Sequence, residues 1–150
     1  MKQLLCLMMV LIVAAPAAAL AKKKITMPTA RAVYHNNQGV SFLNKNEYDR
    51  AEVEFKTAIE LSPEYVEAYN NLGVVFSKQG KYDPAADQFR HAIDLDKNYA
   101  AAYSHLGAVL MSQGNIDEAI KTIQKGLKKD GALADGHYNL ALAYLSLIHI

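Results

Sequence analysis

A column of small residues recurs along this chain at intervals of 34 residues, together with columns of large apolar residues. The small column comprises Gly39, Gly73, Gly107 and Ala141, and large side chains follow three positions later, at Phe42, Phe76, Leu110 and Tyr144. Later in each repeat the pattern continues with Ala51, Ala85 and Ala119, and four positions further on with Phe55, Phe89 and Ile123. Residues three or four positions apart share a helical face. Each repeat therefore predicts two helices, and such a pair must stack on its neighbours to bury its apolar faces.

Turn and capping residues recur at the same spacing. Asn46, Gly80 and Gly114 follow the first helix of each repeat, where a residue that tolerates a left-handed backbone is favoured. Asp49, Asp83 and Asp117 come shortly afterwards, and we expect them to cap the second helices.

These columns resemble the tetratricopeptide repeat family, and the middle repeat, with Tyr69, Leu72, Gly73, Phe76, Ala85 and Phe89, matches its pattern best. The resemblance implies an all-α fold, a right-handed superhelical solenoid of antiparallel helix pairs. The predicted units are 32–65, 66–99 and 100–133, followed by a partial unit at 134–150. His35 and His137 stand where the family has a large aromatic, and we expect them to pack as its substitutes.

In this family the first helices of the repeats line a concave groove that holds a peptide. The resemblance thus predicts a protein–protein interaction scaffold for an extended or helical peptide. The candidate groove residues are Asn36, Asn37, Val40, Asn70, Asn71, Val74, Ser104, His105, Ala108 and Asn139. The asparagines offer both a donor and an acceptor, so they suit the backbone of a peptide. Family members that bind chaperone C-termini use a clamp of basic residues, which the matching positions Asn36, Val40, Asn71, Ala101 and His105 lack.

The sequence shows no signal for an enzyme, a cofactor or a metal. The five histidines do not form a metal-ligand spacing, and serine-nucleophile and phosphate-loop motifs are missing. Five of the 16 basic residues precede Ala32, which leaves 11 against 15 acidic residues, so the repeats carry a net charge of −4 and do not suggest a nucleic-acid partner. Two alternatives stay open: a substrate-recruiting repeat region of a larger enzyme, or a structural subunit of a cell-envelope or secretion assembly.

The N-terminus has the three-part pattern of a secretory signal peptide. A basic start at Lys2 precedes the apolar run 4–13 and a small-residue segment that ends at Ala21. We expect cleavage after Ala21, with Ala19 as second choice, and export to a bacterial periplasm or secretion. The alternative is an uncleaved membrane anchor over residues 4–21. Residues 22–31 are predicted to form a linker, and the only cysteine, Cys6, lies in the segment to be removed.

The last six residues, Leu145–Ile150, can be back-translated into the end of a transposase adapter used in sequencing libraries. We therefore expect this tail not to be native and the chain to be a piece of a longer array, against the alternative of a genuine apolar helix. The nucleotide sequence of these codons decides between the two.

Overall fold

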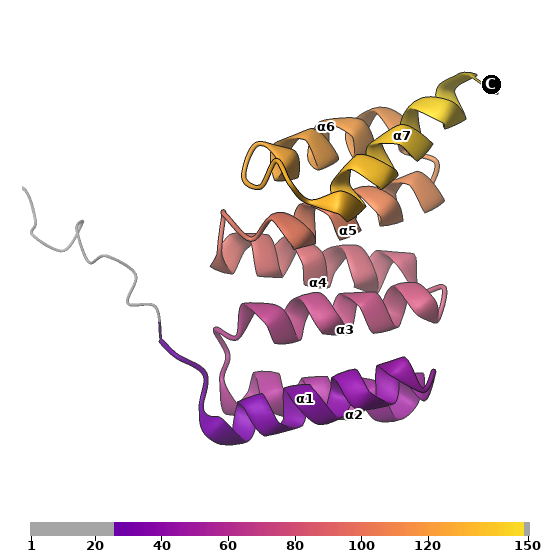
Figure 1. Cartoon of the computed structure of the whole chain (residues 1–150). Helices are drawn as coiled ribbons and strands as arrows, with labels where there is room; N and C mark the ends of the chain where they lie inside the picture. The colour runs from indigo at the N-terminus through magenta and orange to yellow at the C-terminus, as the bar shows by residue number, and fades with distance from the viewer. Residues whose placement is uncertain (1–25, 149–150) are drawn as a thin grey trace, which may run out of the picture.

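The computed structural model describes residues 26–148, which form seven α-helices in the order α1 Ala30–Asn44, α2 Tyr48–Leu61, α3 Val66–Lys78, α4 Tyr82–Leu95, α5 Ala100–Ser112, α6 Ile116–Leu127 and α7 Ala134–Ile148. We call α1, α3, α5 and α7 the A helices and α2, α4 and α6 the B helices. Each A helix except α7 pairs with the B helix that follows it, and each pair stacks on the next (Figure 1). The predicted all-α solenoid of helix pairs is confirmed. The predicted signal peptide, residues 1–21, lies outside the described residues.

The helix starts follow the repeat spacing, since α3, α5 and α7 begin at residues 66, 100 and 134. Helix α1 begins at Ala30, within the segment predicted as a linker, because Thr29 acts as its N-cap. The Thr29 side chain accepts a hydrogen bond from the Ala32 amide at 3.2 Å, and its own amide donates to Ser62 Oγ at 2.9 Å. The first repeat is thus tied at its start to the end of its own B helix.

The A-to-B turns confirm the predicted left-handed residues. Asn46, Gly80 and Gly114 have φ values of 60°, 74° and 82°. In the middle turn the amide of Gly80 donates to Ser77 O at 3.0 Å, and the next amide, that of Lys81, donates to Phe76 O at 2.9 Å. This pair of bonds is a Schellman motif, which satisfies carbonyl groups at the end of the A helix. The other two turns repeat it.

The predicted capping role of Asp49, Asp83 and Asp117 is wrong. The residues at the N-cap positions are Glu47, Lys81 and Asn115, and none of them makes a side-chain capping bond. The reason is that the last residue of each Schellman motif already serves as the N-cap, so the aspartate falls inside the first helical turn. There Asp49 and Asp83 accept hydrogen bonds from Gln79 Nε2 and Gln113 Nε2, at 3.1 and 2.6 Å, and so bind the next A helix.

The core depends on close contact between each A helix and its B helix. A Cβ placed on Gly73 would lie 2.7 Å from the Phe89 ring, and one on Gly39 would lie equally close to Phe55. In the third repeat a Cβ on Gly107 would lie 2.3 Å from Ile123 Cγ1. Phe55, Phe89 and Ile123 are fully buried. The small column therefore exists to receive the large side chain of the same repeat.

Helix α7 is the last described element and leaves part of its apolar surface exposed. Tyr138, Leu145 and Ile148 are 65%, 51% and 78% exposed. Within residues 26–148, no helix combines the length and the apolar character needed to cross a bilayer.

Candidate functional site

The A helices lie side by side, because α1 contacts α3, α3 contacts α5, and α5 contacts α7. Polar side chains connect each of these pairs. Asn71 Nδ2 donates to Asn36 Oδ1 at 3.0 Å, and His105 Nδ1 lies 2.8 Å from Asn70 Oδ1. At the next interface Asn139 Nδ2 donates to Ser104 Oγ at 3.1 Å. We call these six residues the amide column.

The amide column has a buried and a half-buried half. Asn36, Asn70 and Ser104 are 7%, 4% and 1% exposed, so they belong to the interfaces between repeats. Asn71, His105 and Asn139 are half-buried, and Asn37, which opens the series on α1, is exposed. The structure thus brings together six of the ten predicted groove residues as bonded pairs. It gives three of them, Asn36, Asn70 and Ser104, a role inside the stack.

The predicted apolar groove residues lie half-buried on the same helices. Val40 and Val74 pack against the core cluster that runs through the repeats, and Ala108 is half-buried one repeat further on. Together with Asn37 and the outer half of the amide column, they form what we call the A-helix face. This face offers amide groups beside a moderately apolar strip.

His105 is the one ionisable group of the amide column. Burial lowers its pKa from the ordinary 6.5, and the charge of Asp135 opposes this shift. Its ring also packs against the Phe89 ring, with centroids 5.3 Å apart. The imidazole is therefore uncharged at neutral pH and acts as a neutral partner of Asn70.

The free energy of unfolding should consequently decrease as the pH drops below 6.5, because His105 takes up a proton more readily in the unfolded chain than in the folded one. His105→Asn places in the third repeat the residue found in the other three, whose amide can replace the bond to Asn70. We expect chemical unfolding at pH 7.5 and pH 5.0 to show a smaller loss of stability in His105→Asn than in the unmodified chain. Equal losses in both proteins would contradict a protonation penalty at His105.

The residue four positions before the small column of each A helix makes a polar contact that the sequence did not reveal. Tyr69 and Tyr103 donate their hydroxyl hydrogens to Pro63 O and Lys97 O, each at 3.1 Å. His137 Nε2 lies 2.8 Å from Gly131 O and makes the equivalent contact despite its exposed ring. The corresponding ring in α1 is that of His35, whose Nδ1 lies 2.7 Å from Glu54 Oε2 instead.

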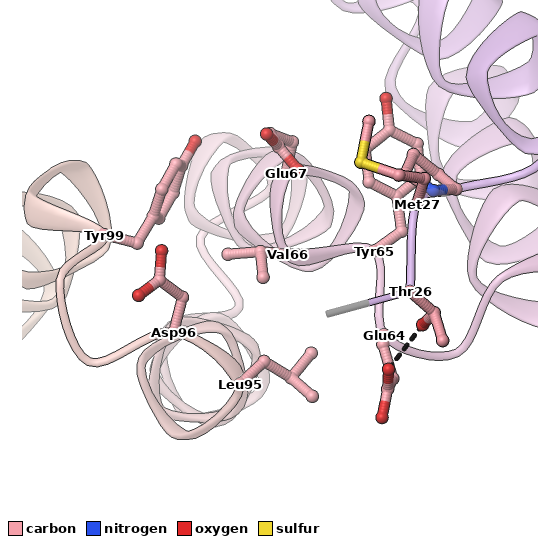
Figure 2. Close-up of a pocket in the computed structure, with 10 residues that line it drawn as sticks. Thr26, Met27, Glu64, Tyr65, Val66, Glu67, Leu95, Asp96 and Tyr99 are labelled. Atoms are coloured by element: carbon pink, nitrogen blue, oxygen red, sulfur yellow. Dashed lines mark hydrogen bonds between the residues drawn. The ribbon is translucent and has the colours of Figure 1, made fainter. Parts of the chain in front are cut away.

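No group of three or more metal-ligating side chains occurs among residues 26–148. A cavity of about 380 Å³ lies away from the A-helix face, at the edge of the stack where α3 begins and α4 ends (Figure 2). Its lining includes Tyr65, Val66, Leu95 and Tyr99, none of which the sequence had singled out. That cavity could not be foreseen, because it is completed by the chain segment before α1.

Comparisons with solved structures agree with this architecture. The first TPR of Spaghetti (RPAP3) bound to an HSP90 peptide is 19% identical with a TM-score of 0.77, over 81% of this chain and 99% of that one. The Sgt2 TPR domain of Aspergillus fumigatus is 20% identical with a TM-score of 0.77, over 80% and 81% of the two chains. The second TPR domain of human RPAP3 in complex with an HSP70 peptide is 21% identical with a TM-score of 0.72, over 79% and 98%. At these sequence identities, the three similarities show a shared fold.

Comparison with curated protein sequences gave no significant match. The profile of the TPR repeat, in contrast, matches three consecutive stretches, residues 39–80, 75–114 and 109–147. Together these matches run from within α1 into α7 and cover residues 39–147, more than half of the chain. The chain therefore belongs to the tetratricopeptide repeat family.

Proposed function

We propose that this chain is a non-enzymatic scaffold that binds an extended or helical peptide segment of a partner protein along its A-helix face. The observation that carries the proposal is the continuity of this face across four neighbouring A helices, with amide groups and an apolar strip side by side. Two of the similar structures were solved with a bound peptide, SRMEEVD in one and SGPTIEEVD in the other. They supply a precedent for the mode of binding.

The chemistry of the face favours an uncharged or mildly basic peptide with apolar side chains. The side chains of Asn37, Asn71 and Asn139 can pair with peptide N–H and C=O groups. Asn36, Val40 and Ala101 carry no positive charge where a basic clamp would need it, and burial keeps His105 neutral. An acidic C-terminal peptide such as SRMEEVD should therefore bind poorly.

Peptide selection from a random library on the full chain tests the proposal. We expect enriched peptides to be apolar and to lose affinity about tenfold or more in Asn37→Ala/Asn71→Ala, since each hydrogen bond contributes about 0.5–1.5 kcal/mol. Gln88→Ala on helix α4 is a matched control, because it removes an amide from a B helix. Isothermal calorimetry gives the affinities, and circular dichroism checks that both variants are folded. Affinity unchanged in the double variant, or lost equally in Gln88→Ala, would argue against binding at this face.

We further propose that the chain is exported by a signal peptide at residues 1–21, to a bacterial periplasm or the exterior. The basic start, apolar run and small-residue segment support this proposal. Contact with a membrane would then arise only if residues 4–21 stayed attached as an anchor. The net charge of −4 from Ala32 onward supports a protein partner rather than a nucleic acid.

A further inference from the structure

The edge cavity lies where the segment before α1 meets the second repeat and the start of the third. Val66, Leu95 and Tyr99 give it an apolar lining, which Met27 and Pro28 complete. At about 380 Å³ it reaches the range of sites that hold a ligand, about 300–1,000 Å³. The lining shares no residue with the A-helix face, so a ligand bound here would occupy a separate surface of the scaffold.

Two tyrosine hydroxyls at this cavity have no hydrogen-bond partner among residues 26–148. Tyr65 and Tyr99 both line the cavity, and Tyr65 is only 9% exposed. By contrast, the hydroxyls of Tyr69 and Tyr103 donate to backbone carbonyls. A polar group on a side chain as buried as Tyr65 usually has a partner. The two free hydroxyls are therefore available to a ligand.

Carboxylates lie around the same cavity. Glu64, Glu67 and Asp96 line it, and none of them forms an ion pair with any residue that the structure describes. Glu64 accepts a hydrogen bond from Thr26 Oγ1, and Asp96 Oδ1 accepts one from the Asn98 amide, but neither donor carries a charge. No basic residue belongs to the described lining, so its negative charge is uncompensated.

The charge of Glu67 acts on both tyrosines. Burial and then Glu67 raise the pKa of Tyr65, while burial, followed by the charges of Glu67, Tyr65 and Asp96, raises the pKa of Tyr99 to about 12. Figure 2 shows the Glu67 side chain between the two tyrosines. Both hydroxyls stay protonated at neutral pH, and a cation bound beside them would offset the charge of Glu67.

We propose that the edge cavity is a binding site for a basic segment of a partner protein, in which a lysine or arginine is flanked by aliphatic residues. The aliphatic side chains contact Val66 and Leu95, and the cation lies against Glu67 and Asp96. The choice of a cation follows from a lining with three carboxylates and no base. An acidic segment would add to this negative charge, and a purely apolar one would leave it uncompensated.

This site gives the scaffold two surfaces with different preferences. The A-helix face offers amide groups beside an apolar strip, whereas the edge cavity offers carboxylates around an apolar lining. The inference goes beyond the proposed function and does not depend on it. Two segments of one partner, or segments of two partners, can then be held at the same time.

Fluorescence anisotropy with labelled, end-blocked peptides and the full chain tests the site. The peptide GVKIG presents a lysine between two aliphatic residues. In the matched peptides, glutamine replaces the lysine (GVQIG) or alanine replaces both aliphatic residues (GAKAG). We expect saturable binding of GVKIG, and binding about fivefold or more weaker for each matched peptide. Raising the salt concentration should weaken the binding of GVKIG and leave that of GVQIG unchanged.

Variants of the lining locate the bound peptide. Glu67→Gln/Asp96→Asn removes two charges and keeps the side-chain shapes, so the affinity for GVKIG should fall about fivefold or more. Glu60→Gln is the matched control, because it removes the charge of an exposed glutamate on α2 that lies outside the cavity lining. It should bind GVKIG as the unmodified chain does. Circular dichroism checks the fold, and Glu67→Gln alone replaces the double variant if that variant does not fold.

Three results would each overturn the proposal: no saturable binding of GVKIG, equal binding of GVQIG, or equal affinity in Glu67→Gln/Asp96→Asn and Glu60→Gln. Loss of GVKIG binding in Asn37→Ala/Asn71→Ala alone would also overturn it, since the peptide would then lie on the A-helix face. Peptides selected on the A-helix face should bind Glu67→Gln/Asp96→Asn as they bind the unmodified chain. Failure at the edge cavity is thereby distinguished from failure of the proposed function.

Discussion

Replacing Phe89 with alanine is expected to lower the free energy of unfolding by about 3–5 kcal/mol, as is usual when a buried phenylalanine is truncated. Phe89 is 1% exposed, lies at the centre of the stack and packs on the backbone of α3 at Gly73. Urea unfolding followed by circular dichroism gives the loss. Val53→Ala, at a position 62% exposed on helix α2, is the control and should change stability by less than about 0.5 kcal/mol.

The same contact predicts a coupling between the two positions. Gly73→Ala alone should destabilise by about 1–3 kcal/mol, because its Cβ would overlap the Phe89 ring, which is 2.7 Å away, and the packed helices cannot separate freely. In the Phe89→Ala background the ring is gone. There Gly73→Ala should be neutral or stabilising by up to about 1 kcal/mol, through the helix preference of alanine. Additive effects in this double-mutant cycle would show that the glycine serves something other than the ring.

These positions also show why so much of the fold could be predicted from the sequence. The repeat keeps a fixed spacing between a glycine in the A helix and a phenylalanine in the B helix. Such a pair is explained by two packed helices in which the phenylalanine ring lies against the glycine. The left-handed turn residues were predictable for the same reason, since Asn46, Gly80 and Gly114 combine tolerance of positive φ with a fixed place in the repeat.

The aspartates show where this reasoning ended. An aspartate just before an expected B helix is a typical N-cap. In this structure, however, the last residue of the Schellman turn is itself the N-cap, so the B helix begins earlier in the sequence than expected. Asp49 and Asp83 consequently lie in the first turn of their helices, where they accept hydrogen bonds from Gln79 and Gln113 of the next repeat. The choice between these roles depends on the path of three turn residues, which local propensity does not determine.

The sequence identified the six residues of the amide column as groove candidates, but it did not predict the hydrogen bonds between them. The bonded pairs Asn36–Asn71, Asn70–His105 and Ser104–Asn139 share one sequence separation, which a search for paired polar columns could have found. The division between a buried and a half-buried partner depends on how far one repeat turns relative to the next. That rotation is a property of packing and has no counterpart in the pattern of a single repeat.

Asn70→Ala is expected to destabilise the protein by about 2–3 kcal/mol. Asn70 is 4% exposed, and its removal leaves the His105 ring without its partner at 2.8 Å while opening space between α3 and α5. An unsatisfied buried polar group costs about 1–3 kcal/mol, and the lost packing adds to that cost. Unfolding in urea at pH 7.5 measures the loss.

Asn37→Ala is the matched control, because it removes the same side chain from the neighbouring column at an exposed position. It should leave the free energy of unfolding within about 0.5 kcal/mol of the unmodified chain. The two variants should therefore separate two tasks: Asn70 holds the repeats together, while Asn37 remains available to a peptide. A loss of stability in Asn37→Ala as large as that in Asn70→Ala would refute this division, since both asparagines would then be structural.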